Sequence, residues 1–266
     1  TVFDRYDDQV TSSNTTTSGA SSIYQGNFYF LTSTNKVYKV LNNNGGTAFS
    51  GSEPTSTSTS PFESGGYVLK YMYEITSSEA TKFLTTDYMP VSTDSTVSAA
   101  ATDGKIESLA ITVGSGYNDG TYYFPVFGDG TSQGTSSGAI VRATVSGGAF
   151  ADFGLTAGTD TTIHAGGSGY TFANVSLTNV FSDAALSSST TVGSGTGAVI
   201  RPIISPKDGH GANAVNELGG HFVITNTTLT QAEGDDFTTA NDFRNVGIVV
   251  DPTDFGTSTI ATASTR

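Results

Sequence analysis

Residues 65–75 read GGYVLKYMYEI, and this stretch decides the fold class. Five apolar side chains alternate along it and share one face of an extended strand: Tyr67, Leu69, Tyr71, Tyr73 and Ile75. Lys70 and Glu74 fall on the other face, which completes a period of 2. The stretch therefore predicts a β-strand with one side packed on a core and the other side polar.

The composition of the 266 residues points the same way. The chain holds 43 Thr, 33 Ser and 32 Gly, and its 16 Phe and 12 Tyr are typical of a chain that folds. Thr, Val, Tyr and Phe favour strands, whereas Gly, Ser, Asn and Asp favour turns. We expect a mainly β protein, two-lobed and β-sandwich-like, with a Gly-rich duplicated β insert and a few short helices.

The first hundred residues contain further local signals. Residues 28–41 predict a β-hairpin, because two apolar runs flank a polar turn. Residues 51–61 predict a solvated loop. Thr76-Ser77-Ser78-Glu79 is a capping-box pattern, and it predicts a short helix over 77–84. Residues 92–104 are polar and Ala-rich, and we expect a linker there.

An internal repeat occupies residues 105–204. Gly114-Ser115-Gly116-Tyr117 recurs 53 residues later as Gly167-Ser168-Gly169-Tyr170. Ser137-Gly138-Ala139-Ile140-Val141-Arg142 recurs 59 residues later, in the same order relative to the first motif, as Thr196-Gly197-Ala198-Val199-Ile200-Arg201. Two motifs that recur in order indicate a duplicated structural unit.

The duplication makes three structural expectations. Tyr117 and Tyr170 occupy equivalent places, and so do Arg142 and Arg201. The two copies pack together, because one copy is too small to bury both faces of its strands. The extra residues of the second copy form a surface loop within 181–193.

The last third returns to strands and short helices. Residues 201–206 are extended, 207–211 form a turn, 213–218 form a short helix before Gly219-Gly220, and 221–225 form a strand. Beyond these, Gly234-Asp235-Asp236 predicts a turn, 239–243 a helix and 246–250 a strand. We therefore expect a mainly β body of 1–104 and 201–266, with 105–200 inserted as a β-repeat lobe.

Charge and cysteine content exclude several classes of function. Lys and Arg total 11 against 24 Asp and Glu, which gives a formal net charge of −13. Nucleic-acid binding depends on Lys and Arg, so no nucleic-acid partner is expected. The chain lacks Cys, which excludes disulfides, Cys-ligated zinc and thiol catalysis. No apolar run approaches the ~20 residues that span a bilayer, so no membrane partner is expected either.

Three histidines are the first candidates for chemistry. His210 lies between two glycines, where it could act as a base or as a metal ligand. No second histidine has ligand spacing with it, and no serine or paired acid completes a catalytic set. We interpret His210 as a turn residue whose side chain bonds a neighbouring backbone group. His164 in a loop and His221 at the start of a strand are interpreted as ordinary.

Acidic and glycine-rich segments suggest calcium or nucleotide sites. Asp129, Glu233, Asp235 and Asp236 offer oxygen ligands, but no complete calcium-binding loop is present, and a turn explains Asp129 alone. Residues 192–201 resemble a phosphate-binding glycine loop only in letters, because no helix follows. No cofactor and no metal are therefore expected.

Aromatic strand residues leave two carbohydrate-related hypotheses. Tyr67, Tyr71 and Tyr73 could form a sugar-stacking platform, although we interpret them as one core-facing side of a sheet. A β-helical depolymerase would need a pair of carboxylates across a groove, which cannot be placed in this sequence. We therefore predict no catalytic, cofactor-binding or metal residues, and no enzyme.

Three stretches together resemble a known family. They are residues 28–41 leading to GGYVLKYMYEITSSEATKFL, the GSGY-type repeats, and RPIISPKDGHGANAVNELGGHFV followed by FRNVGIVVDP. The chain resembles the baseplate wedge subunit (gene product eight) of T-even-like contractile-tailed phages, particularly the cyanophage type. The likeness covers most of residues 20–252, and relatives carry a further N-terminal segment ahead of the part that matches.

The resemblance implies a structural role and no catalytic residues. It implies a virion protein of the tail baseplate, assembled in the host cytoplasm, that bridges other baseplate wedge proteins and can pair with a second copy of itself. Such a component holds its neighbours by shape and strand surface, and it belongs to the apparatus of host attachment. The alternative is a carbohydrate-binding tail or adhesin module.

Overall fold

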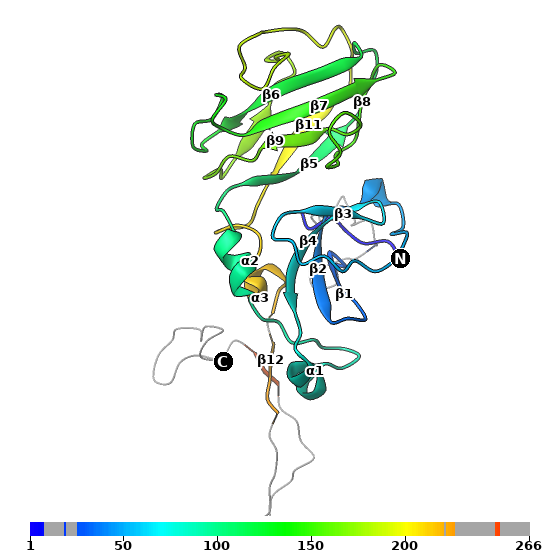
Figure 1. Cartoon of the computed structure of the whole chain (residues 1–266), viewed down its shortest axis with the longest axis vertical. Coiled ribbons are helices and arrows are strands. Elements are labelled where there is room, and N and C mark those ends of the chain that lie inside the picture. Colours follow the sequence, from blue (N-terminus) through cyan, green and yellow to red (C-terminus); the bar gives the residue numbers. More distant parts are fainter. Residues whose placement is uncertain (8–18, 20–25, 221, 227–247, 251–266) are drawn as a thin grey trace, which may run out of the picture. The chain divides into compact units, whose positions relative to one another are not determined.

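The computed structural model describes residues 1–7, 19, 26–220, 222–226 and 248–250. Within these ranges strands outnumber helices, and the strands form four sheets (Figure 1). The prediction of a mainly β protein with a few short helices is therefore confirmed.

The chain forms two compact units. The first contains Thr1–Glu74 and Thr93–Ala214, and the second contains Ile75–Ser92 and the described part of Val215–Arg266. We predicted an inserted lobe over residues 105–200. Its bounds differ from those of the two units, so the lobe stays a prediction.

The first unit begins with an antiparallel sheet in the order β1-β2-β4-β3 (Figure 1). Its strands are β1 (Tyr29–Leu31), β2 (Lys36–Asn42), β3 (Phe62–Ser64) and β4 (Tyr67–Glu74). β1 and β2 form the hairpin predicted for residues 28–41, with Tyr29 opposite Lys39. The turn between them holds Asn35 at a φ of 61°, a left-handed conformation that asparagine tolerates.

Strand β4 is buried on both sides, and this corrects the polar face predicted for Lys70 and Glu74. Leu69 packs in an apolar cluster on one side of the sheet, whereas Val68 belongs to the main core of the unit. Lys70 is only 2% exposed, and Glu74 alone in this strand reaches solvent. The alternation in sequence is real, but a second layer of the fold covers the side that it marks as polar.

Two predicted helices are present. Helix α1 (Ser77–Phe83) begins at the predicted capping box: the Thr76 side chain accepts from the Glu79 amide, and the Glu79 side chain accepts from the Thr76 amide. Helix α3 (Ala214–Glu217) lies within the predicted 213–218. After α3 the Gly220 amide donates to the Val215 carbonyl at 2.8 Å, which ends the helix where the glycine pair predicts.

The linker predicted over residues 92–104 is wrong, because it contains helix α2 (Ser95–Ala100). The Asp94 carboxylate accepts from the amides of Thr96 and Val97 and starts the helix. Val97, 1% exposed, anchors it in an apolar cluster with residues of β2 and β4. A single helical turn, Asn44–Gly46, follows β2.

The Gly-repeat segment forms the rest of the strands of the first unit. They are β5 (Ile106–Thr112), β6 (Gly120–Gly128), β7 (Ile140–Ser146), β8 (Ala149–Phe150), β9 (Thr162–Ala165), β10 (Ala173–Val175) and β11 (Val199–Ile204). One sheet has the order β10-β6-β7-β8, with β9 also paired to β7, and β11 pairs with β5 in a sheet of two. All of these pairs are antiparallel.

Strands are exchanged between the two copies of the repeat. β5 of the first copy pairs with β11 of the second, and β9 of the second copy pairs with β7 of the first. β6 and β10, which follow the two GSGY motifs, pair with each other across the copies, with Ala173 opposite Gly128. The copies therefore pack together as predicted, by crossing over rather than by stacking side by side.

The two GSGY motifs have equivalent places in this arrangement. The hydroxyl of Tyr117 accepts from the amide of Ala198, and the hydroxyl of Tyr170 accepts from the amide of Ala139, both at 3.2 Å. Ala139 and Ala198 are themselves equivalent in the second motif. Each tyrosine thus bonds the backbone just before or at the start of a strand in the other copy, and we call this pair of contacts the tyrosine clamps. The predicted equivalence of Tyr117 and Tyr170 is confirmed.

The glycines of the motifs have matching conformations. Gly114 and Gly116 have φ values of 63° and 78°, and Gly167 and Gly169 have 59° and 72°. A φ in this region favours glycine, so each motif makes the same turn. The extra residues of the second copy form a turn closed by a bridge between Phe181 and Ser189, within the predicted loop.

The described part of the second unit contains a small antiparallel sheet. Strand β12 (Phe222–Ile224) pairs with β13 (Ile248–Val250) and falls within the strand predicted for 221–225. β13 likewise falls within the predicted 246–250. The predicted turn at 234–236 and helix at 239–243 lie outside the described residues.

Candidate functional site

His210 lies in a buried polar cluster of the first unit and not in an exposed turn. Its ring is 1% exposed, and its Nδ1 lies 3.2 Å from Nζ of Lys39 on β2. The ring of Tyr6 contacts His210 edge-on, with the centroids 4.7 Å apart, and Lys39 Nζ lies 4.5 Å from the Tyr6 ring centre. No local sequence pattern indicated this contact with β2. The bond expected between the His210 side chain and a neighbouring backbone group stays a prediction.

Local backbone geometry brings His210 to this position. The Gly209 amide donates to the Pro206 carbonyl at 2.8 Å, which closes the predicted turn. Gly209 has a φ of 97°, and a Cβ at this position would lie 2.4 Å from the Thr102 amide nitrogen. The turn therefore requires glycine both for its conformation and for its close approach to another segment. Its effect is to fix His210 against Lys39 of β2.

A second buried cluster joins the N-terminal sheet to β5. Lys70 Nζ donates to the Thr59 carbonyl and lies 4.0 Å from Oε1 of Glu107, and Lys105 Nζ lies 3.0 Å from the same oxygen. Lys70 and Glu107 are 2% and 8% exposed. Two cations thus surround one buried carboxylate, and paired burial of this kind satisfies the charges. The alternating pattern of β4 could not predict this cluster, because Glu107 lies on a distant strand.

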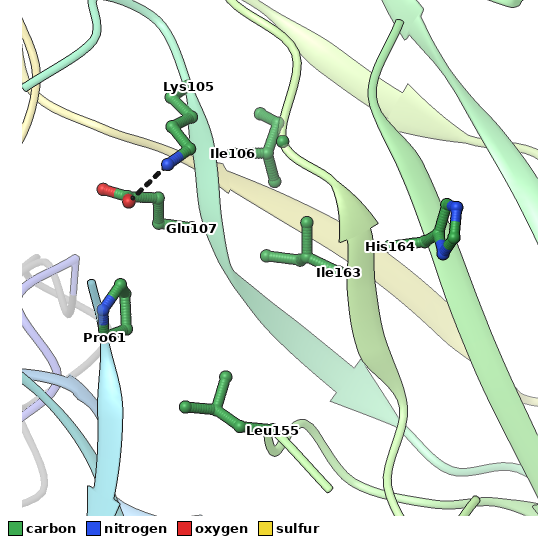
Figure 2. Close-up of a pocket in the computed structure, with 8 residues that line it drawn as sticks. Pro61, Lys105, Ile106, Glu107, Leu155, Ile163 and His164 are labelled. Carbon is green, nitrogen blue, oxygen red and sulfur yellow. Dashed lines mark hydrogen bonds and ion pairs between the residues drawn. The ribbon is translucent and has the colours of Figure 1, made fainter. Parts of the chain in front are cut away.

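A pocket of about 250 Å³ opens beside this cluster (Figure 2). The residues that line it are Pro61, Lys105, Ile106, Glu107, Leu155, Ile163, His164 and Gly166. Ile106 and Ile163 give it an apolar wall, and the Lys105–Glu107 pair stands across from Pro61 (Figure 2). In the same view the His164 ring is directed away from the ion pair. The charged groups of the pocket neutralise each other, and its lining residues do not bring a nucleophile to a base.

Asp129 bonds a segment 42 residues further along the chain. Its carboxylate accepts from the amides of Thr171 and Phe172, at 2.8 and 3.2 Å, and from the Thr171 hydroxyl. The hydroxyl and amide of Thr171 lower the pKa of Asp129 to about 2. We expected a bond within the turn of Asp129 itself, and these bonds to a distant segment correct that interpretation. Glu233, Asp235 and Asp236 lie outside the described residues.

The described ranges contain no group of three or more His, Asp or Glu that could hold a metal ion. His164 lies exposed on β9, with its ring edge-on to Tyr123 at 5.7 Å between centroids. His221 lies outside the described residues. The prediction of no catalytic, cofactor-binding or metal residues stays a prediction.

The three tyrosines of the carbohydrate hypothesis are core residues. Tyr67, Tyr71 and Tyr73 are 0%, 4% and 1% exposed. The Tyr67 hydroxyl donates to the Thr47 carbonyl at 2.7 Å, so its polar end is used inside the protein. Burial, followed by the charges of Asp94 and Glu74, raises the pKa of Tyr71 to about 12. Their interpretation as the buried side of a sheet is confirmed, and they offer no surface for a sugar.

Among the helices that the structure describes, none is long and apolar enough to cross a membrane. The sequence matches no model of a known protein family and no curated protein, and the structure matches no solved structure.

Proposed function

We propose that this chain is a structural component of the baseplate wedge of a contractile-tailed phage, where it bridges neighbouring baseplate proteins. One observation carries the proposal: the segments that resemble the wedge subunit include the framework strands of the first unit. Residues 28–41 and 65–75 supply β1, β2 and β4, and residues 201–211 supply most of β11 and the turn that holds His210. The likeness thus falls on the residues that determine the fold.

The use of charged groups supports a structural role. Lys39 contacts His210, and Lys70 and Lys105 surround Glu107, so these buried polar groups join segments that are distant in sequence. Buried polar contacts of this kind specify one arrangement of the chain, which suits a protein that must present fixed surfaces to its neighbours. Other wedge proteins and a second copy of this chain are its proposed partners.

The experiment that tests this proposal is localisation in intact particles. An antibody raised against the purified chain is applied to contractile-tailed virions that carry it, and the labelled particles are imaged. We expect label at the baseplate ring, and density for the two units in a reconstruction of that ring. Label at an exposed fibre tip, together with specific binding on a glycan array, would replace the wedge proposal by the adhesin alternative.

A further inference from the structure

Arg142 lies in the middle of the largest sheet, on the side that faces away from the main core. Its neighbours in β7, Val141 and Ala143, are 0% exposed and belong to the core, so the Arg142 side chain lies on the opposite face. Tyr123 of β6 and Thr162 of β9 are its register partners on the two sides. The guanidinium therefore sits between two strands on an outward face.

Its charge is poorly satisfied. Nη1 is buried and has no hydrogen-bond partner among the described residues, while Nη2 donates to Thr121 Oγ1 at 3.5 Å, the long limit for such a bond. Arg142 forms no ion pair in the part of the chain that the structure describes. A half-buried guanidinium with one long hydrogen bond, an unpartnered Nη1 and no counter-charge is unfavourable, and in a chain with 24 acidic residues it is unexpected.

The equivalent arginine of the second repeat copy has a carboxylate partner. Arg201 is the equivalent residue of the second copy, and its Nη2 donates to Asp7 Oδ2 at 2.8 Å. The Arg201 side chain is 54% exposed, so water solvates it as well. The exposed arginine of the repeat, Arg201, thus has a carboxylate partner. The more buried one, Arg142, has none, although a buried charge depends more on a partner.

Two rings lie on the face of the sheet that carries Arg142. The rings of Tyr123 and His164 meet edge-on at 5.7 Å, one from each strand that flanks β7. Tyr123 is half-buried and His164 is exposed. Aromatic side chains around an arginine are typical of the residues that contribute most to protein–protein binding. We call Tyr123, Arg142 and His164 the Arg142 face.

We infer that the Arg142 face binds an acidic segment of a partner protein, with an Asp or Glu carboxylate on the guanidinium. A carboxylate accepts two parallel bonds from the planar guanidinium fork, which is the chemistry that Asp7 supplies to Arg201 in part. The Arg142 guanidinium turns outward on binding and exchanges one long bond to Thr121 for two bonds to the carboxylate. The rings of Tyr123 and His164 pack against the peptide beside the carboxylate. A small free anion has no peptide chain to make this contact.

This inference deepens the proposed function, since it rests on the chain having protein partners and names the chemistry of one. Its test uses the purified chain and peptides, so it is independent of where the chain lies in a particle. Either proposal can therefore fail while the other stands.

The test is a titration of the full chain with the peptide GSEGSEGSEG and with its Gln twin, GSQGSQGSQG, followed by NMR. We expect the Glu peptide to shift the signals of Tyr123, Arg142 and His164, and the Gln peptide to bind at least about tenfold more weakly. Arg142→Met abolishes the difference, and Arg142→Lys, which keeps the charge but not the fork, retains part of it. The matched control, Arg201→Met, leaves binding unchanged.

Thermal unfolding of the same variants separates binding from folding. We expect Arg142→Met to unfold at the same or a higher temperature, because it removes an unsatisfied charge, and Arg201→Met to unfold at the same or a lower one. A lower unfolding temperature for Arg142→Met than for Arg201→Met would show that Arg142 serves the fold and would overturn the inference. It is equally overturned if the two peptides bind alike, if neither binds, or if acetate competes as tightly as the Glu peptide.

Discussion

Tyr38 and Tyr71 face each other across β2 and β4, with ring centroids 5.8 Å apart. Both are nearly inaccessible to solvent, and the Tyr38 hydroxyl donates to the Ser56 carbonyl at 2.8 Å. Burial raises the pKa of Tyr38 to about 12, and the charges of Tyr71 and Glu74 add to the effect. The pKa of Tyr71 is raised to about 12 as well, again chiefly by burial. Neither phenol ionises easily in the folded protein.

These raised pKa values predict a loss of stability in alkaline solution. In the unfolded chain both phenols ionise near pH 10, whereas in the folded chain they ionise near pH 12. Their contribution is therefore fully present below pH 10 and is lost as the pH rises toward 12. Denaturant unfolding at a series of alkaline pH values, with tyrosinate absorbance as a second signal, measures this. Tyr38→Phe should make the decline shallower, and an unchanged slope would contradict the assignment.

Asp129 predicts the opposite dependence, at acid pH. Its pKa is lowered from 3.8 to about 2 by the bonds from Thr171 and Phe172, so its contribution is present above pH 4 and is lost as the pH falls through about 2. Asp129→Asn should therefore flatten the acid branch of the stability curve. Asp87→Asn, at an exposed position, controls for the loss of one negative charge. A carboxyl NMR titration of Asp129 with its midpoint near 4 would contradict the prediction.

Single residues differ in how far the sequence predicts them. Tyr67 and Tyr71 were interpreted correctly as the buried side of a strand, because alternation is a local pattern. Asp129 was expected to bond its own turn, but its carboxylate bonds Thr171, 42 positions away.

His210 and Lys70 were misplaced, since each owes its burial to a residue far along the chain. Lys39 is 171 positions from His210, and Glu107 lies on β5, outside the sheet that contains Lys70. No local pattern encodes such a contact.

At the scale of elements, the N-cap of α2 makes a measurable contribution to the free energy of unfolding. The Asp94 carboxylate accepts from the Thr96 and Val97 amides at 2.8 and 3.0 Å, and these are the bonds that begin α2. We expect Asp94→Ala to lower the free energy of unfolding by about 1 kcal/mol, the usual value of an N-cap. Urea unfolding measures it, with Asp87→Ala as a control that removes an exposed aspartate. Equal stability of both variants would show that packing of Val97 alone maintains the helix.

The crossed tyrosine clamps predict a matched pair of effects. Tyr117→Phe and Tyr170→Phe each remove a hydroxyl that accepts a backbone amide of the other copy. Each should lower the free energy of unfolding by about 1–2 kcal/mol, because a largely enclosed amide is left without its partner. Tyr88→Phe, at an exposed position, should change it by less than about 0.5 kcal/mol. Clearly unequal losses for Tyr117 and Tyr170 would show that the two copies are not equivalent in energy.

Elements themselves were predicted well where their signals are local. The 28–41 hairpin, the 77–84 helix and the repeated turns depend on residues within a few positions of one another. Helix α2 was missed although Asp94 is a suitable N-cap, because its short run of Ser, Thr and Ala has one apolar residue, Val97, and so no helical period. Strand exchange between the copies could not be predicted. Pairing within one copy and pairing between the copies both fit the same alternation of apolar and polar residues.

At the scale of the whole molecule, charge predicts how the protein behaves toward nucleic acid. With a net charge of −13 and 11 Lys and Arg, few contacts to phosphate can form. We expect no retention of double-stranded DNA at physiological salt in a gel-shift assay with the full chain. A lysozyme of strongly basic charge serves as the positive control. A salt-dependent shift of the DNA band by this chain would contradict the prediction.

The exchange of strands also governs when the lobe can fold during synthesis. β11 leaves the ribosome roughly 90 residues after the strand with which it pairs, β5. At ~5–20 residues per second, β5 waits on the order of 5–20 seconds with its edge exposed. The first copy therefore emerges complete in sequence but unable to close its sheet, and it is then most open to chaperones and to pairing with another nascent chain. The sheet of β5 and β11 can therefore form only after β11 has left the ribosome.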